Sequence, residues 1–158
     1  MSNFENNIHN MTNINPSKPV GFKPMKMLLV EDSSLLREVL FEIISNLKNL
    51  SVEGMASTQT KAISLLKEKQ FDILLLDIEL SEGNGFEIIK HTKKPHYPFK
   101  PPIVMMLTNH ANPHYRSLAK DLGVDYFFDK SMDFDMAIKA IELEAERFNN
   151  MYSKLISS

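Results

Sequence analysis

The stretch that decides the fold is Phe71-Asp72-Ile73-Leu74-Leu75-Leu76-Asp77-Ile78-Glu79-Leu80. Four apolar residues stand in a row from Ile73 to Leu76 and lead directly to the acid Asp77. A short apolar run without polar alternation is typical of a strand buried on both faces, as in a parallel sheet covered by helices. Asp77 would then stand at the carboxyl edge of the sheet, where open α/β sheets place their chemistry.

The segments on either side of this strand alternate between strand and helix patterns. Short apolar runs predict strands at residues 27–30, 52–56, 71–76, 103–107 and 124–128. Apolar residues at helical spacing predict helices over residues 36–47, 58–66, 86–91, 112–123 and 134–148. Thr58 is the predicted cap of the second helix, and Asn112-Pro113 is the predicted start of the fourth. Five strand–helix units predict one α/β domain, with a five-stranded parallel sheet and helices on both of its faces.

The predicted domain covers residues 25–150 and is flanked by segments of different composition. Six of the first fifteen residues are asparagine and three prolines follow, so residues 1–24 are expected to be a disordered or loosely attached N-terminal arm. Residues 151–158 are expected to be a C-terminal tail. Residues 93–102 contain four prolines and are expected to form an irregular loop at the edge of the sheet away from Asp77.

The composition is that of a soluble globular protein. Hydrophobic residues make up 43% and charged residues 24% of the 158 residues, which allows a substantial core. The net charge of -2 provides no general attraction to nucleic acid or to an anionic membrane, so neither is an expected partner. The absence of cysteine excludes disulfides and thiol chemistry. The sequence has neither an apolar run of membrane-spanning length nor a secretion signal, so the expected location is the cytoplasm.

Polar residues follow the ends of four predicted strands. Glu31 and Asp32 follow the first strand, Asp77 the third, Thr108 the fourth and Lys130 the fifth. Because parallel strands end at one edge, this order gathers three carboxylates, a hydroxyl and an ammonium in one cleft. Adjacent carboxylates repel one another unless a cation lies among them, and their hard oxygen atoms suit Mg²⁺. A carboxylate can also accept a phosphoryl group as a nucleophile, so the set predicts Mg²⁺-dependent phosphoryl transfer.

With these residues in order, the chain over residues 25–150 resembles the receiver domain of response regulators in two-component signalling, and is similar to the single-domain chemotaxis receiver. The resemblance implies a doubly wound, flavodoxin-like sheet with the strand order 2-1-3-4-5. It implies that Asp77 is the phosphoacceptor. It also implies a metal site in which Mg²⁺ is bound by Asp32, Asp77 and the main-chain carbonyl of Glu79, and by Glu31 through a water molecule.

The same resemblance assigns roles to residues further along the chain. It implies that Thr108, the switch hydroxyl, and Lys130 act with Asp77 as the catalytic residues. Gly85, eight residues after the acceptor, matches a glycine of the family. Phe127, three residues before the lysine, matches an aromatic position of the family, and it fits either simple core packing or a switching rotamer.

Three positions depart from the usual pattern of the family. Ser81 and Ser131 stand where proline is frequent, and Asn109 stands where alanine is frequent. None of the three removes a reacting group. The bond after the lysine is typically cis in the family, and we predict a cis Lys130–Ser131 bond despite a cost of about 2.5–4 kcal/mol before a non-proline residue.

Several residues allow more than one interpretation. Asp32 is expected to cap the first helix as well as to bind metal. The five histidines show no metal-ligand spacing, and His110, two residues after Thr108, is expected at the rim of the cleft. A second stripe on the last helix, formed by Met136, Ala140 and Leu143, fits either partial packing or a weak homodimer face.

The resemblance implies a stand-alone receiver and not an enzyme with substrates of its own. A histidine kinase or phosphotransfer protein would donate the phosphoryl group, the domain would catalyse its own phosphorylation and dephosphorylation, and an unknown partner protein would carry the output. An unphosphorylated pseudo-receiver adaptor is the alternative, although no acid is missing here. An aspartyl phosphatase would need a second Asp where Glu79 stands. A flavodoxin-type binder would need a phosphate loop where Glu31-Asp32 stand.

Overall fold

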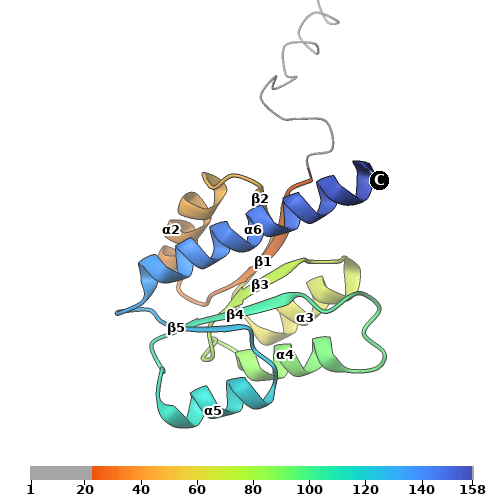
Figure 1. The fold of residues 1–158 in the computed structure, drawn as a ribbon. Helices are drawn as coiled ribbons and strands as arrows, with labels where there is room; N and C mark the ends of the chain where they lie inside the picture. The colour runs from red at the N-terminus through yellow and green to blue at the C-terminus, as the bar shows by residue number, and fades with distance from the viewer. Residues whose placement is uncertain (1–22, 158) are drawn as a thin grey trace, which may run out of the picture.

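Five parallel strands form the centre of the molecule (Figure 1). The computed structural model describes residues 23–157, and its strands are β1 (Met25–Val30), β2 (Leu50–Ala56), β3 (Ile73–Leu76), β4 (Ile103–Thr108) and β5 (Tyr126–Asp129). The strands pair in the order β2-β1-β3-β4-β5, and every neighbouring pair is parallel. The predicted doubly wound α/β class and the strand order 2-1-3-4-5 are confirmed.

The strand of the deciding stretch, β3, lies in the middle of the sheet between β1 and β4, and all four of its residues are buried. Successive side chains of a strand point to opposite faces. Leu74 and Leu76 accordingly belong to one core cluster, and Ile73 and Leu75 belong to the other. Phe71, predicted as the first strand residue, precedes β3 and is buried in the first of these clusters.

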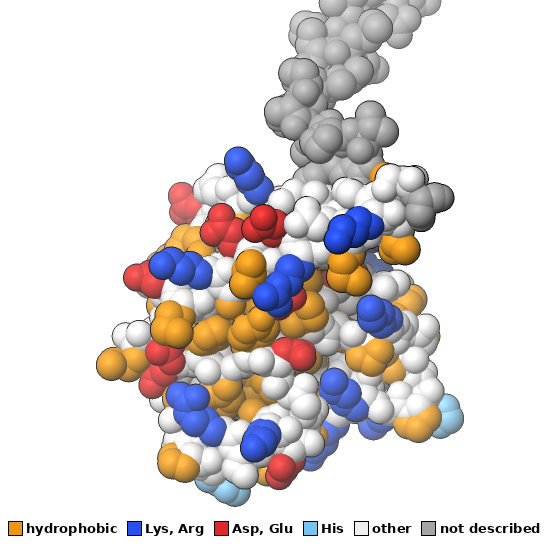
Figure 2. Space-filling view, viewed as in Figure 1, with side chains coloured by type: hydrophobic (Ala, Val, Ile, Leu, Met, Phe, Trp, Pro, Cys, Tyr) orange, Lys and Arg blue, Asp and Glu red, His pale blue; other side chains and the backbone are white. Residues whose placement is uncertain are grey.

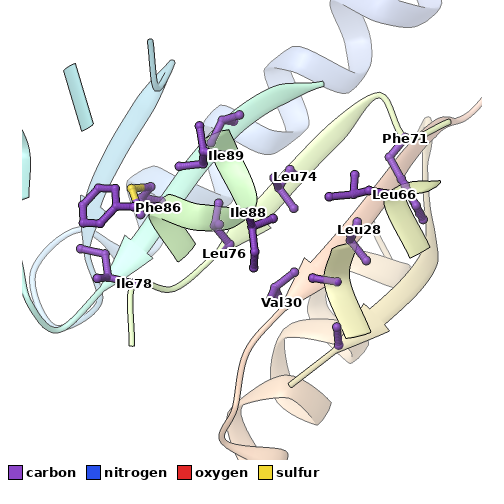
Figure 3. Close-up of a cluster of buried hydrophobic side chains, with 14 of the residues drawn as sticks. Leu28, Val30, Leu66, Phe71, Leu74, Leu76, Ile78, Phe86, Ile88 and Ile89 are labelled. Atoms are coloured by element: carbon purple, nitrogen blue, oxygen red, sulfur yellow. The ribbon is translucent and has the colours of Figure 1, made fainter. Parts of the chain in front are cut away.

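Helices cover both faces of the sheet (Figure 1). The helices α2 (Ser34–Ser45) and α6 (Phe134–Ser157) lie on one face, and α3 (Gln59–Glu68), α4 (Gly85–Lys93) and α5 (Pro113–Asp121) lie on the other. Figure 3 shows the core of the second face, where Leu66 of α3 and Ile88 of α4 meet strand residues such as Leu28 and Leu76. The apolar stripes that predicted the helices are therefore the faces that they bury.

Polar caps begin four of these helices. The side chains of Ser33, Thr58, Asn84 and Asn112 each accept a hydrogen bond from the backbone N–H three residues later. Each bond satisfies a donor that the first helical turn leaves unpaired. The predicted caps at Thr58 and Asn112 are confirmed. The prediction that Asp32 caps α2 is wrong, because Ser33 takes that role.

The last helix, α6, is longer than the sequence pattern indicated. It has 24 residues, or about 36 Å at 1.5 Å per residue. Residues 151–157, expected as a tail, continue the helix. The other end of the described chain lies beside it, since the backbone N–H of Lys23 donates to Asn149 Oδ1 at 3.3 Å. The arm expected over residues 1–24 falls outside the described residues, apart from its last two.

The proline-rich segment after α4 forms a loop, as predicted. It runs from the end of α4 at Lys93 to the start of β4, at the amino edge of the sheet. Tyr97 holds the loop against the domain by packing edge-on against His91 and Phe99, with ring centroids 5.8 Å and 6.0 Å apart. Among residues 23–157, no helix combines the length and apolar character that crossing a bilayer requires.

We predict that Gly85, the first residue of α4, is required for stability. A Cβ atom at this position would overlap the backbone carbonyl oxygen of Asp77. Gly85→Ala is therefore expected to lower the free energy of unfolding by about 3 kcal/mol, the upper part of the range for overpacking. The control is Gly123→Ala, where a Cβ would meet almost open space and only the left-handed backbone (φ +74°) is unfavourable. Its expected cost is about 1 kcal/mol.

Urea denaturation followed by circular dichroism measures both variants. Equal losses of stability would contradict a specific contact between α4 and the backbone of Asp77.

Candidate functional site

The polar residues predicted from the strand ends meet at the carboxyl edge of the sheet. Glu31 directly follows β1, Asp77 follows β3, Thr108 is the last residue of β4, and Lys130 follows β5. The side chains come together because all the strands run in one direction and end at the same edge. Glu31, Asp77 and Thr108 are almost completely buried, with 2%, 6% and 0% of their surface exposed. Asp32 is exposed beside them.

The ammonium group of Lys130 joins two of the acids. Its Nζ atom lies 2.6 Å from Asp77 Oδ2 and 2.6 Å from Glu31 Oε1. Burial by itself would lower the pKa of Lys130, but the hydrogen bonds to Asp77 and Glu31 outweigh burial and raise this pKa. Lys130 therefore stays charged at neutral pH and offsets the negative charge of both carboxylates.

The carboxyl group of Glu31 is the least well satisfied group of the site. Burial raises its pKa, the ion pair with Lys130 opposes this effect, and the nearby charges of Asp77 and Asp32 add to it. The second oxygen, Oε2, is buried and has no hydrogen-bond partner within residues 23–157. A buried carboxylate oxygen without a partner is costly. A cation or a water molecule bound at this atom would remove that cost.

The three acids form a group that could hold a metal ion. One carboxylate oxygen from each of Glu31, Asp32 and Asp77 lies within 4.8 Å of the others. Mg²⁺ prefers a few carboxylate ligands and keeps several waters, which suits one exposed and two buried acids. The unpaired Oε2 of Glu31 supports the same fit. The carbonyl of Glu79 as a further ligand stays a prediction.

Asp77 is held firmly in place. Its Oδ1 accepts a hydrogen bond from the backbone N–H of Ile78 at 2.7 Å, while Oδ2 accepts from Lys130. Its own backbone N–H donates to the carbonyl of Val30 at 3.2 Å, which ties the residue to β1. Both carboxylate oxygens therefore have a defined direction at the mouth of the site.

The hydroxyl of Thr108 is bonded to its own loop. Its Oγ1 accepts a hydrogen bond from the backbone N–H of His110 at 3.1 Å. No hydrogen bond among the described residues joins Thr108 to Asp77. In this arrangement the threonine stabilises the turn after β4 and does not contact the acceptor.

A contact between His110 and Glu79, not expected from the sequence, spans the rim of the site. His110 Nε2 lies 3.0 Å from Glu79 Oε2, with both side chains substantially exposed. His110 was expected at the rim, but a bond to Glu79 was not. The sequence did contain an indication of this contact. Glu79 stands two residues after Asp77 and His110 two residues after Thr108, at the ends of the neighbouring strands β3 and β4.

The turn after Lys130 corrects another prediction. The cis Lys130–Ser131 bond is not found, since no peptide bond in residues 23–157 is cis. Instead, Asp129 Oδ1 accepts hydrogen bonds from the backbone N–H and the hydroxyl of Ser131, at 2.8 Å and 2.6 Å, and from the N–H of Met132 at 3.3 Å. These bonds lower the pKa of Asp129. A side-chain turn of this kind aims the lysine at Asp77 with a trans backbone.

The fold and the site together define a class: a doubly wound α/β domain with an acidic triad and a lysine at the carboxyl edge of its sheet. The model of the response regulator receiver domain matches residues 27–142, which is most of the chain. The chain belongs to this family.

Curated relatives share part of this chain. A protein-glutamate methylesterase/protein-glutamine glutaminase 2 from Vibrio vulnificus is 37% identical over 106 residues, which cover 66% of this chain and 30% of the relative. The sensory transduction protein LytT from Bacillus cereus is 29% identical over 118 residues, which cover 75% of this chain and 46% of the relative. The chain thus spans less than half the length of these relatives.

Solved structures agree with the fold. The response regulator domain of CheB from Thermotoga maritima matches with a TM-score of 0.67 and 24% identity over 81% of this chain and 98% of that chain. A CheY-like receiver domain protein from Methanospirillum hungatei matches with a TM-score of 0.64 and 22% identity over 79% of this chain and 98% of that chain. At these identities the comparisons support the architecture and nothing finer.

We predict that Lys130 keeps the metal-free protein stable. Lys130→Met would leave Glu31 and Asp77 buried without their shared cation. The expected loss is about 3 kcal/mol in the free energy of unfolding, as for other broken buried ion pairs. The control is Lys90→Met, which breaks the exposed pair with Glu87 (3.0 Å) and should cost no more than about 0.5 kcal/mol.

Urea denaturation in the presence of a chelator measures both variants. Adding Glu31→Gln to Lys130→Met should recover part of the loss, because one uncompensated charge disappears. A Lys130→Met protein as stable as the Lys90→Met control would refute this account of the site.

Proposed function

We propose that this chain is a stand-alone receiver that accepts a phosphoryl group on Asp77 from the phosphohistidine of a histidine kinase or phosphotransfer protein. The observation that carries the proposal is the contact of 2.6 Å between Lys130 Nζ and Asp77 Oδ2, inside a group of three acids. Phosphoryl transfer depends mainly on positioning and on compensation of negative charge. A fixed acceptor carboxylate beside a charged lysine and an acidic cation site provides both.

The reaction forms one bond and breaks one bond. A carboxylate oxygen of Asp77 bonds to phosphorus while the P–N bond of the donor breaks, and the imidazole nitrogen leaves with the electron pair. The product is an acyl phosphate on Asp77, and later attack of water on phosphorus returns the carboxylate and inorganic phosphate. Lys130, already hydrogen-bonded to Asp77, is placed to bind an oxygen of the incoming group.

Mg²⁺ is the proposed cofactor, with Asp32 and Asp77 as its side-chain ligands, the Glu79 carbonyl as a further ligand, and Glu31 binding through a water molecule. When bound, it would offset negative charge on the phosphoryl oxygens. The buried Glu31 and the exposed Asp32 both follow β1, whereas Asp77 follows β3. A cation shared by the three acids would therefore bind on the β1 side of Asp77.

Thr108 links the acceptor to the surface in this proposal. A phosphoryl group on Asp77 would accept a hydrogen bond from the Thr108 hydroxyl, and rotation of this side chain toward Asp77 would break the bond that its oxygen now accepts from the N–H of His110. Giving up that bond loosens the loop before α5. On the neighbouring strand the ring of Phe127 lies under the guanidinium of Arg116 from α5, 4.8 Å from ring centroid to Cζ. The α5–β5 surface is thus the part of the described domain whose populations would shift.

Two exposed apolar side chains mark where a donor protein would bind. Leu35 stands in the first turn of α2, three residues after Asp32, and Met132 stands two residues after Lys130. Their exposed fractions are 73% and 79%. Large exposed apolar side chains beside a reaction site favour a protein surface as the donor over a free small molecule.

The remaining parts of the proposal concern partners and location. Output would pass to a partner protein, and a cytoplasmic location fits a donor of this kind. A weak homodimer through α6 is supported by the exposed side chains of Met136 and Leu143. The methylesterase activity named for some relatives belongs to proteins of which the chain matches less than a third.

Treatment with Mg²⁺ and acetyl phosphate, followed by intact mass measurement, tests the proposal. The protein is expected to gain one phosphoryl group, and Asp77→Asn is expected to gain none because it lacks the nucleophile. The control Asp121→Asn, an exposed acid on α5, should be labelled like the unmodified protein. Circular dichroism verifies that Asp77→Asn is folded.

Other outcomes of the same measurement would support a different function. A protein that gains no phosphate, also when mixed with phosphorylated histidine donors, would support a pseudo-receiver adaptor. Steady hydrolysis of assorted phosphate esters would support a phosphatase. Equal labelling of Asp77→Asn and the unmodified protein would refute Asp77 as the acceptor.

Asp32→Ala tests the metal site. The variant loses the exposed carboxylate of the triad, so Mg²⁺ affinity should fall by about tenfold or more, since even partners outside the ligand shell cost 10–100-fold in other metal sites. The metal-free variant should gain some stability, because the repulsion of Asp77 and Glu31 is eased. The control Glu38→Ala, on α2, removes another exposed acid outside the triad. Calorimetric titration with MgCl₂ that gives one affinity for all three proteins would exclude Asp32 as a ligand.

A further inference from the structure

A groove of about 350 Å³ lies at the amino edge of the sheet, at the opposite end from the acidic site. One wall is the last part of α6, with Phe148, Met151 and Tyr152, and the other is formed by the segments that lead into β3 and β4, with Phe71 and Ile103. In Figure 2, hydrophobic side chains gather on the face below α6, with Lys and Arg side chains beside them. A groove of this size and apolar lining can bind one polypeptide segment.

One wall of the groove lies beyond the matched receiver domain. The family match ends at residue 142, whereas the α6 residues of the groove begin at Glu144. The part of α6 that forms the wall is therefore the extension of the helix. Met151 on this extension has 65% of its surface exposed, so the apolar wall lacks a complete cover within the described residues.

The chain enters the described fold at this groove. Lys23, the first described residue, is one of the lining residues. Its backbone N–H donates to Asn149 Oδ1, and its ammonium lies 5.8 Å from the ring centroid of Phe148 and 5.2 Å from that of Tyr152. The 22 residues before Lys23 are consequently tethered at the rim, and a short tether of this kind gives an effective concentration of the order of mM.

The sequence of that segment matches the groove in pattern and in length. Phe4, Ile8, Met11 and Ile14 are spaced by four, three and three residues, which places them on one face of a helix, with asparagines at most of the other positions. In a helix, Phe4 and Ile14 would be about 15 Å apart, and the α6 wall from Glu144 to Leu155 is about 16 Å long. The residues between Ile14 and Lys23 can extend about 27 Å, which is enough for the chain to double back.

We propose that residues 4–14 of this chain bind in the groove between α6 and the amino ends of β3 and β4, with Phe4, Ile8, Met11 and Ile14 facing its apolar walls. The inference is independent of the proposed phosphoryl transfer, because the groove lies at the other edge of the sheet. The bound segment covers the part of α6 that extends past the receiver domain.

Paramagnetic labelling of the full chain tests the proposal, and the absence of native cysteine makes a single introduced thiol unique. A nitroxide on Asn13→Cys, opposite the apolar face of residues 4–14, should remove most of the intensity of the Met151 and Tyr152 amide signals. Met11→Asp or Met151→Asp should restore these signals. The matched controls Thr12→Asp and Met136→Asp, the latter an equally exposed methionine outside the groove, should leave the loss unchanged.

A mixture of nitroxide-labelled protein without ¹⁵N and unlabelled ¹⁵N-protein identifies the occupant. Full intensity in the mixture, together with loss in the single-chain sample, supports binding within one chain. Loss in the mixture would show that a second copy occupies the groove and would overturn the proposal. Unchanged groove signals in the single-chain sample would overturn it as well.

Discussion

The sharing of one ammonium group between Glu31 and Asp77 is the interaction on which the rest of the site depends. Two buried carboxylates side by side are costly without a cation, because they repel each other and burial removes the water that would solvate their charges. Lys130 supplies that cation from the end of β5, the edge strand of the sheet, with Nζ 2.6 Å from each acid. The parallel sheet is what makes this contact possible, since residues nearly a hundred positions apart in sequence end at one edge.

The local structure around each charged group holds Lys130, Glu31 and Asp77 in the positions that this contact requires. The Asp129 turn directs Lys130 toward the acids without a cis bond, and the Gly85 backbone lets α4 begin directly against Asp77. Ser33 caps α2, which leaves the neighbouring carboxylate of Asp32 to the acidic group. A cation bound by the acids would compete with Lys130 for the same carboxylates, so the lysine and the metal site form a single electrostatic unit.

The sequence allowed the fold and the membership of the site to be predicted because both follow from short-range patterns. Buried strands are uninterrupted apolar runs, and polar residues directly after them must lie at the carboxyl edge, as Asp77 and Lys130 do. The features that were predicted wrongly or missed depend on which of several neighbouring side chains forms a given hydrogen bond. Asp32 and Ser33 were equally good caps, and Asp129 could replace the expected cis geometry only through bonds to Ser131. The pairing of His110 with Glu79 depends on the exact approach of two loops.

The contact between His110 and Glu79 makes the opening of the site asymmetric. It joins the loops after β3 and β4, which lead into α4 and α5, and so it restricts one side of the mouth above Asp77. The opposite side, where α2 begins and the turn after Lys130 lies, carries the exposed Leu35 and Met132. A reacting molecule of any size therefore has a preferred direction of approach, from the α2 side. Water faces the same asymmetry, so solvent reaches Asp77 through the same open side as a larger molecule does.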